Sequence, residues 1–280
     1  MLRDITLGQY YQADSVIHRL DPRVKLSATV LFIISLFVVD NWIGYAIAAV
    51  FLACMVKISG VPFRFMVKGM KSIVFLLLIA VGFNLFLTPG KAVFSVWKLT
   101  ITEEGVRIAV MMAVRLVFLI IGSSLMTLTT TPNNLTDGME KLMAPLKIFH
   151  VPVHEVAMMM SIALRFIPIL LEETDKIMKA QIARGADFES GNLVKKAKAM
   201  VPLLVPLFIS AFRRANDLAM AMEARCYRGG EHRTKMKPLI YHKRDRIGYL
   251  VMFVYLAACI YFGRIFTLPA VWGMVWNRNV

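Results

Sequence analysis

The sequence is poor in charged residues, which occupy 18% of its 280 positions, whereas soluble domains average about 25%. Hydrophobic residues reach 58%, above the ~45–50% that is usual for a soluble domain. They occur in continuous runs rather than on one periodic face. The low charge therefore excludes an ordinary soluble protein and indicates that much of the chain lies in lipid.

Cysteine is scarce as well. Cys54, Cys226 and Cys259 lie far apart and form no CxxC pair. This spacing excludes a disulfide framework and a zinc site built on paired cysteines.

The common catalytic motifs are missing. The chain has no GxxxxGK[ST] phosphate loop, no HExxH pair and no G-x-S-x-G turn. We therefore expect no catalytic residues and no ATP bound by this chain. The one close acidic set, Glu172, Glu173 and Asp175, is interleaved with Lys176, so it is a poor magnesium cluster for a membrane prenyltransferase.

His150 and His154 are four residues apart and Glu155 follows them. Pro152 lies between the two histidines, and the sequence offers no evident third ligand. We therefore expect no metal site here and no cofactor bound by this chain.

Basic residues are abundant but uneven. The formal net charge is +15, and 19 of the 33 Lys and Arg residues fall between Thr131 and Arg246, together with 12 Asp and Glu. A nucleic-acid surface would carry stacking aromatics among these charges, but this stretch is rich in Met, Ala and Leu. Lys and Arg favour the cytoplasmic side of a membrane, so we expect cytoplasmic orientation and no nucleic-acid partner.

Five apolar runs are candidate membrane spans. The first two are shorter than the ~20 residues that cross a bilayer, but Lys25 and Lys57 can extend them by reaching the interface. A single bent helix is the alternative for these two. The five runs are Leu26–Val39, Trp42–Val56, Ser72–Thr88, Ile108–Leu128 and Ile247–Phe262.

Loop charge predicts the orientation of the spans. The Asp40-Asn41 turn has no Lys or Arg, residues 57–71 have four, and residues 131–246 have 19. The sequence thus predicts an all-α, polytopic helical protein of the cell membrane, with its N-terminus inside and its C-terminus outside. Its parts are a four-span region (1–130), a cytoplasmic module of long helices (131–246), and a last span with a tail (247–280).

Arg115 interrupts the fourth run. Arginine within a span is costly and often functional. The simpler interpretation, which we favour, is a side chain that reaches the outer interface or pairs within the helix bundle.

The cytoplasmic module contains two long helical patterns. The first runs from Glu155 to Arg184, with a kink expected at Pro168. The second follows Lys195, with a kink or break expected near Pro202 and Pro206. It ends before Gly229-Gly230.

Both patterns end in an arginine between small residues, Ala183-Arg184-Gly185 and Ala224-Arg225-Cys226, 41 positions apart. Small neighbours allow a partner groove to approach, and a guanidinium offers a rigid fork of donors. A solvated arginine that complements the helix dipole is the simpler alternative. The repetition favours two docking ends.

Four segments together resemble the T component of energy-coupling factor (ECF) transporters, the EcfT/CbiQ family, and the resemblance extends over about residues 15–265. The segments are His18-Arg19-Leu20-Asp21-Pro22-Arg23-Val24-Lys25-Leu26, Ala163-Leu164-Arg165-Phe166-Ile167-Pro168, Ala183-Arg184-Gly185 and Ala221-Met222-Glu223-Ala224-Arg225-Cys226-Tyr227-Arg228-Gly229-Gly230.

The resemblance implies a non-catalytic membrane subunit that joins two ATP-binding-cassette (ABC) ATPases to a substrate-capturing membrane S component for vitamin or micronutrient uptake. It implies that Arg184 docks in one ATPase and Arg225 in the other, with Ala183, Gly185, Ala224 and Cys226 permitting insertion. ATP would be bound by the partner ATPases. A dedicated cobalt or nickel system, or a conventional ABC permease with a single coupling motif, is the alternative.

Overall fold

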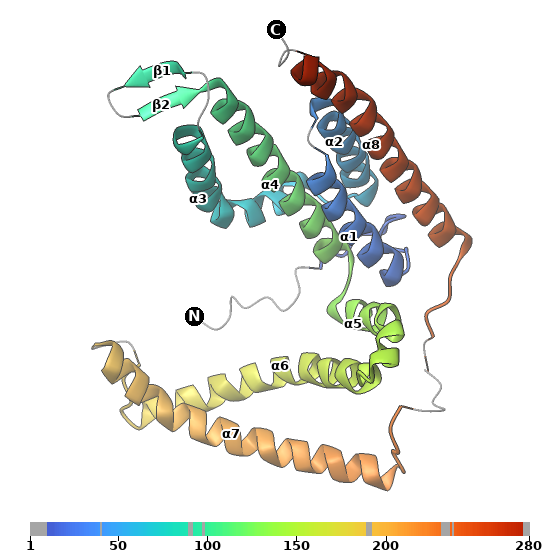
Figure 1. The fold of residues 1–280 in the computed structure, drawn as a ribbon. Helices are drawn as coiled ribbons and strands as arrows, with labels where there is room; N and C mark the ends of the chain where they lie inside the picture. The colour runs from blue at the N-terminus through green and yellow to red at the C-terminus, as the bar shows by residue number, and fades with distance from the viewer. Residues whose placement is uncertain are drawn as a thin grey trace. The chain divides into compact units, whose positions relative to one another are not determined.

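The computed structural model describes residues 10–39, 41–88, 92–96, 99–188, 192–230, 236 and 238–276. The described part is helical apart from one antiparallel hairpin, β1–β2. The all-α prediction is confirmed, and the hairpin is an addition that the sequence did not predict. The elements in chain order are α1 (Pro22–Val38), α2 (Trp42–Ser59), α3 (Phe63–Leu87), β1 (Ala92–Val96), β2 (Leu99–Thr102), α4 (Glu103–Thr129), α5 (Pro132–Leu142), η2 (Ala144–Phe149), α6 (Val153–Ala183), α7 (Leu193–Ala224) and α8 (Lys243–Trp276) (Figure 1).

The chain divides into two compact units. The first, here called the membrane unit, comprises Gly8–Gly138 and Leu239–Val280; the second, the long-helix unit, comprises Met139–Pro238. Helix α5 begins in the membrane unit and ends in the long-helix unit. The three-part division with boundaries after residues 130 and 246 stays a prediction, because compactness alone does not locate a bilayer.

Local sequence signals begin the membrane helices. Pro22 occupies the first turn of α1, where a missing N–H costs nothing, and the Asp21 carboxylate accepts a hydrogen bond of 2.8 Å from the backbone N–H of Arg23. At the start of α4, Thr102 Oγ1 accepts from the N–H of Gly105 at 3.0 Å. Each side chain satisfies a backbone donor that the helix itself leaves unpaired.

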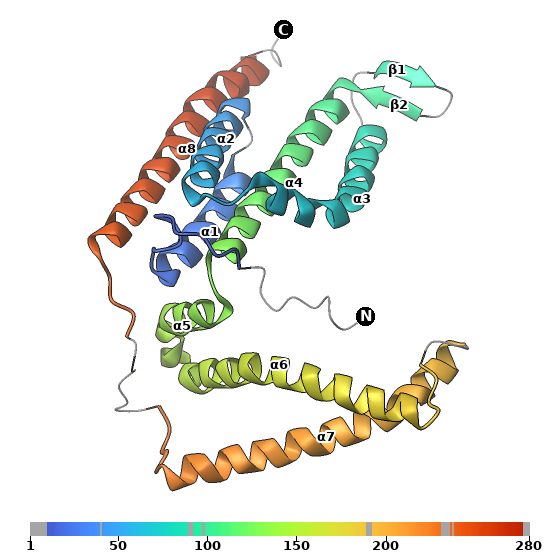
Figure 2. The same ribbon diagram turned by 180° about the vertical axis from the view of Figure 1, so that it is seen from behind.

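Helices α1, α2, α4 and α8 pack around one apolar core, with α3 against α4 (Figure 2). The rings of Phe51 and Tyr255 stack at 4.2 Å between centroids, which joins α2 to α8. The Tyr255 hydroxyl also shares a hydrogen bond of 2.8 Å with Ser35 Oγ of α1. Tyr255 thus contacts two neighbouring helices through one apolar and one polar interaction.

The outward faces of the membrane unit are apolar too. Large side chains are exposed along α1, α3 and α8, and such continuous apolar surface marks a lipid-facing or partner-facing protein. Together with the apolar helices, this surface supports a multi-pass membrane location. Examples are Ile34, Phe37, Phe75, Leu78, Phe83, Leu250, Phe253 and Val254.

Four described helices are long and apolar enough to cross a membrane: α2, α4, α6 and α8 as far as Phe262. Three of them contain predicted spans. The two other predicted spans are shorter than the ~20 residues that cross a bilayer. Helix α1 has 17 residues, and the apolar part of α3, Ile73–Phe86, is shorter still. Helix α6 meets the same criteria although the sequence predicts it in the cytoplasm, so the predicted count of about five spans is approximate.

Arg115 is paired within the helix bundle, as the simpler interpretation predicts. Its Nε donates to the Tyr45 hydroxyl at 2.8 Å, and a terminal guanidinium nitrogen lies 3.4 Å from the carbonyl oxygen of Val39. The guanidinium also lies 5.5 Å from the centre of the Phe37 ring. Arg115 therefore ties α4 to the adjoining ends of α1 and α2.

Asp245 fastens the start of α8 to the start of α1. Its side chain is buried, with Oδ1 accepting from the N–H of Asp21 at 2.8 Å and Oδ2 accepting from the N–H of His242 at 2.7 Å. Arg23 lies 3.8 Å above the centre of the Tyr241 ring on the same side of the unit. Two helix N-termini thereby share one buried carboxylate.

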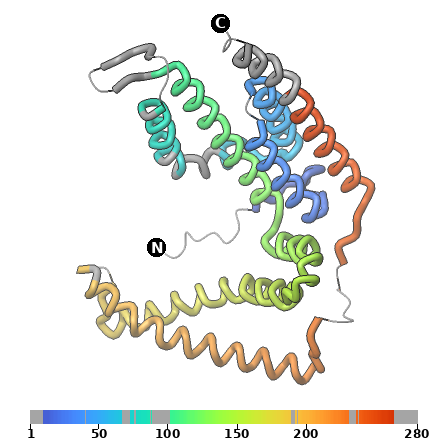
Figure 3. The backbone as a smooth tube through the Cα atoms, viewed as in Figure 1, coloured from blue at the N-terminus to red at the C-terminus, as the bar shows by residue number. Residues whose placement is uncertain are grey.

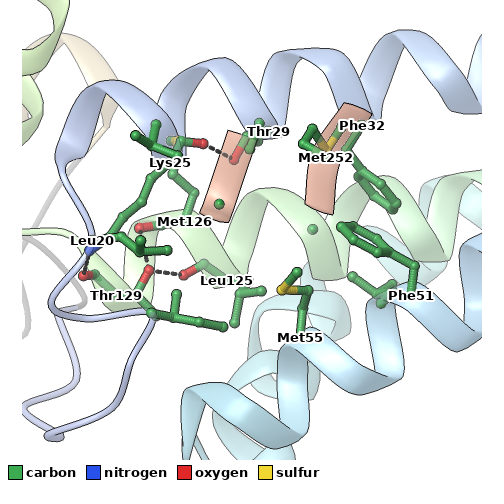
Figure 4. Close-up of a pocket in the computed structure, with 16 residues that line it drawn as sticks. Leu20, Lys25, Thr29, Phe32, Phe51, Met55, Leu125, Met126, Thr129 and Met252 are labelled. Atoms are coloured by element: carbon green, nitrogen blue, oxygen red, sulfur yellow. Dashed lines mark hydrogen bonds between the residues drawn. The ribbon is translucent and has the colours of Figure 1, made fainter. Parts of the chain in front are cut away.

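A cavity of about 110 Å³ lies among α1, α2, α4 and α8 (Figure 4). Its wall is mainly apolar, with Phe32, Phe51 and Met252 along it. At one end the Lys25 ammonium donates to the carbonyl oxygen of Thr129 at 2.8 Å. The cavity is smaller than the ~300 Å³ at which small-molecule sites begin, so it does not have the size of a vitamin-binding pocket.

Candidate functional site

The predicted docking residues lie at the C-terminal ends of α6 and α7, the two long helices of the long-helix unit. Figure 3 traces both helices. Helix α6 has 31 residues and contains Pro168; helix α7 has 32 and contains Pro202 and Pro206. Both are assigned as single helices that run through their prolines. Of the two alternatives expected near Pro202 and Pro206, a break is therefore wrong, whereas a kink stays a prediction. Pro206 offers no N–H to the carbonyl oxygen of Pro202, and Gln181 Nε2 of α6 lies 3.5 Å from that oxygen instead.

Helices α6 and α7 run in opposite directions and cross (Figures 1 and 2). At the crossing, one oxygen of Glu173 accepts from Ser210 Oγ at 2.6 Å, and the other lies 2.9 Å from a guanidinium nitrogen of Arg214. Nearer the end of α6, Gln181 Nε2 lies 3.5 Å from the carbonyl oxygen of Pro202. Polar contacts therefore fix where one helix crosses the other.

Helix α6 ends in a Schellman motif, a C-terminal cap with two characteristic backbone hydrogen bonds. The N–H of Ala186 donates to Gln181 O at 3.0 Å, and the N–H of Gly185 donates to Ile182 O at 2.9 Å. Arg184 is the C-cap residue. Gly185 has φ of 86°, a left-handed conformation that favours glycine.

Helix α7 ends in the same way. The N–H of Tyr227 donates to Met222 O at 3.0 Å, and the N–H of Cys226 donates to Glu223 O at 2.8 Å. Arg225 is the C-cap residue, and Cys226 has φ of 55°. The two motifs recognised in the sequence are thus the same local structure built twice.

Both caps present their arginine outward. The six predicted docking residues, Ala183, Arg184, Gly185, Ala224, Arg225 and Cys226, are all exposed. Within the described residues, neither guanidinium makes a hydrogen bond or an ion pair with the rest of the chain. Each fork can therefore meet carboxylate or carbonyl oxygens of another molecule.

The crossing separates the two ends. Arg184 lies eleven residues after Glu173, and Arg225 lies eleven residues after Arg214. At about 1.5 Å per residue, each arginine is ~16 Å from the ion pair along its own helix. Because the helices run in opposite directions, the arginines point to opposite ends of the unit, about 30 Å apart. Two partner surfaces fit this arrangement better than one.

The histidine pair is not arranged as a metal site. His154 Nδ1 lies 3.1 Å from Glu140 Oε1, whereas His150 is exposed and ends η2 with φ of 59°. Among the residues that the structure describes, no three His, Cys, Asp or Glu side chains form a group that could hold a metal ion.

Sequence reasoning did not identify the Glu173–Ser210–Arg214 contact. In the sequence, Glu173 is notable only as a member of an acidic set with Glu172 and Asp175, and the helical pattern of α7 gives no signal for its partner. Only the crossing of the helices brings Ser210 and Arg214, 37 and 41 positions away, to this carboxylate.

Comparisons with known proteins indicate the family of the chain. Residues 13–236 match the CbiQ family, described as cobalt transport protein. An energy-coupling factor transporter transmembrane protein EcfT from Clostridium kluyveri is 57% identical over 257 residues, covering 91% of this chain and 95% of the relative. The EcfT proteins of Thermosediminibacter oceani (56% over 238 residues, 85% and 90% covered) and Bacillus subtilis (46% over 265 residues, 94% and 100% covered) are also similar.

Proposed function

Because this chain belongs to the CbiQ family and to its EcfT branch of energy-coupling factor transmembrane components, we propose that it couples two ABC-type ATPases to a substrate-capturing membrane subunit. The observation that carries this proposal is the repeated C-cap. Arg184 and Arg225 are presented outward by the same backbone motif at opposite ends of a crossed helix pair.

Each arginine is proposed to insert into a groove of one ATPase. The exposed neighbours Ala183 and Gly185 at one end, and Ala224 and Cys226 at the other, leave the backbone accessible to a close partner. A guanidinium in such a groove makes charge-assisted hydrogen bonds to acidic or carbonyl oxygens. Nucleotide binding and hydrolysis belong to the ATPases in this proposal, and our chain transmits their movement.

The exposed face of α7 is proposed to contact the substrate-capturing subunit. Its apolar residues recur at helical spacing and are each about half exposed or more, so they form one continuous stripe. Such a stripe allows an apolar partner to slide and repack when the ATPases move the helix. The stripe consists of Val201, Leu204, Val205, Phe208, Ile209 and Phe212.

The long-helix unit is proposed to lie in the cytoplasm, where the ATPases are. Its basic excess supports this orientation. The charged residues Glu172, Glu173, Asp175 and Lys176 in the second half of α6 also fit water better than lipid, although the first half of α6 is apolar enough for a span.

A dedicated cobalt or nickel system is the second candidate, and the description of the matching family favours it. In that case the metal would be the cargo of the capturing subunit rather than a ligand of this chain. A conventional ABC permease is less consistent with two equivalent caps, since it needs one coupling motif.

Purification of the tagged, natively expressed chain with its partners tests the proposal. We expect two ABC ATPases and at least one small membrane protein, identified by mass, to co-purify. We expect ATP hydrolysis in the complex and none in the chain alone. Recovery of a single protein without ATPases, or nucleotide binding by the isolated chain, would contradict the proposal.

A further inference from the structure

The turn between α5 and α6 carries an unusual group of exposed apolar side chains. Ile148 and Phe149 are 80% and 75% exposed, and Leu142 and Leu146 beside them are also exposed. Nothing in the described part of the chain covers the first two. Large apolar side chains held this far into solvent mark a surface that another phase or molecule covers.

Local structure holds this turn in one shape. The 3₁₀ helix η2 contains Pro145, and the N–H of His150 closes its last turn on Lys147 O at 3.0 Å. His150 then adopts the left-handed conformation, and Pro152 precedes α6. The two apolar side chains therefore project from a fixed backbone and do not need to be ordered on binding.

The charge of the turn complements an anionic surface. Residues 141–152 include Lys141 and Lys147 and contain no Asp or Glu. Both lysines and His150 are exposed. Bulky apolar residues next to lysines are typical of segments that lie in the interface of a membrane with anionic lipids.

Chain connectivity keeps the turn close to a membrane helix. The middle of α5 packs on the first turn of α1, since a Cβ placed on Gly138 would lie 3.0 Å from Pro22 Cβ. Leu142 is four residues further along the same helix, or ~6 Å.

We propose that residues 141–152 form a membrane-surface anchor. Ile148 and Phe149 enter the apolar boundary of the adjoining leaflet, and Lys141 and Lys147 bind the phosphate groups of anionic lipid headgroups. This role goes beyond ATPase coupling: it fixes the point at which the long-helix unit leaves the membrane, so that movement of α6 and α7 pivots there. An apolar face of a partner protein is the rival occupant, but it would not require the two lysines.

The depth of a spin label in lipid tests the anchor. The full chain, with C54A, C226G and C259A as background and without partner proteins, is reconstituted in vesicles of phosphatidylcholine and phosphatidylglycerol. A nitroxide is placed at F149C, or at I148C as an independent second site. References are the exposed, lipid-facing F253C of α8 and the exposed K195C of α7.

Power saturation with oxygen and with a water-soluble nickel chelate then reports whether each label is in lipid or in water. We expect the label at 149 to resemble that at 253. In the K141Q/K147Q variant, we compare the population of chains whose label at 149 lies in lipid with the population whose label lies in water. The ratio of the first to the second should fall by about fivefold per lysine removed. The matched K195Q/K196Q variant should leave that ratio unchanged.

Two results would overturn the anchor. A label at 149 as accessible to the nickel chelate as that at 195 would show that the turn lies in water. A label that becomes protected only when the substrate-capturing subunit is added would show that the turn is a protein contact. Neither result bears on ATPase docking, which the arginine variants test separately.

Discussion

Glu173 and Arg214 form an ion pair of 2.9 Å at the crossing of α6 and α7, and each is eleven residues before one of the two outward-facing arginines. The pair therefore sets the point about which both candidate docking ends are placed. A change at the crossing moves the two ends relative to each other without altering either cap.

Glu173→Ala should loosen this crossing. Ser210 and Arg214 both lose their acceptor, so the angle between the helices is less restricted. Spin labels at A183C and A224C in a background without the native cysteines should show a broader distance distribution by pulsed EPR. The neighbouring, exposed Glu172→Ala is the matched control and should leave the distribution unchanged. Equal distributions in both variants would mean that apolar packing alone fixes the crossing.

Cys226 is strained where Gly185 is not, since a side chain in the left-handed region costs ~1–2 kcal/mol. Cys226→Gly should therefore strengthen the α7 cap by about 1 kcal/mol, and Gly185→Ala should weaken the α6 cap by a similar amount. Hydrogen exchange of the capping amides should slow about fivefold in the first variant and quicken about fivefold in the second. Cys226→Ser, which keeps Cβ, should behave like the native chain. If Cys226→Ser slowed the exchange of the capping amides as much as Cys226→Gly, loss of the thiol rather than relief of backbone strain would be the cause.

Asp245→Ala should destabilise the membrane unit strongly. The buried N–H of Asp21 and the part-buried N–H of His242 lose their acceptor, and the buried one alone costs about 1–3 kcal/mol. Thermal unfolding in detergent should show a clearly lower Tm. Asp14→Asn, which breaks the exposed Asp14–Arg19 ion pair, should leave Tm unchanged. A similar Tm for both variants would mean that Asp245 does not fasten α8 to α1.

The sequence predicted the helices well because long apolar runs, Pro22 and the glycine stops are local signals. It predicted the two arginine ends for the same reason, since a C-cap is formed by neighbours in the chain. It did not predict the partners of Glu173, Asp245 or Arg115. Those contacts join residues that are 41, 224 and 70 positions apart, and no local pattern encodes them. The exposure of Ile148 and Phe149 also requires the structure, because apolar residues at a turn are as readily buried.

The orientation can be measured by labelling single cysteines in intact cells. Because loop charge places the α1–α2 turn outside and the long-helix unit inside, N41C should react with an impermeant thiol reagent before lysis, and K195C only afterwards. A cysteine at 150, before α6, and K195C, after it, should also label on the same side. Labelling of these two on opposite sides would make α6 a membrane span.

The central claim is that Arg184 and Arg225 are docking ends, and binding of the ATPase pair to the reconstituted chain tests it most directly. Removal of a charge-assisted interface contact costs ~2–5 kcal/mol. Each single Ala variant should therefore weaken ATPase binding by at least about tenfold. Lys at either position should restore binding only partly, because it keeps the charge but not the fork.

The decisive variant is R184A/R225A, compared with K195A/K196A as a control of equal charge change on an exposed basic face. Both variants should insert and fold, since all four side chains are exposed. We expect the double arginine variant to lose the ATPase pair and substrate uptake while the lysine control retains both. Retention of both ATPases and native uptake by R184A/R225A would show that the arginines are ordinary solvated helix ends.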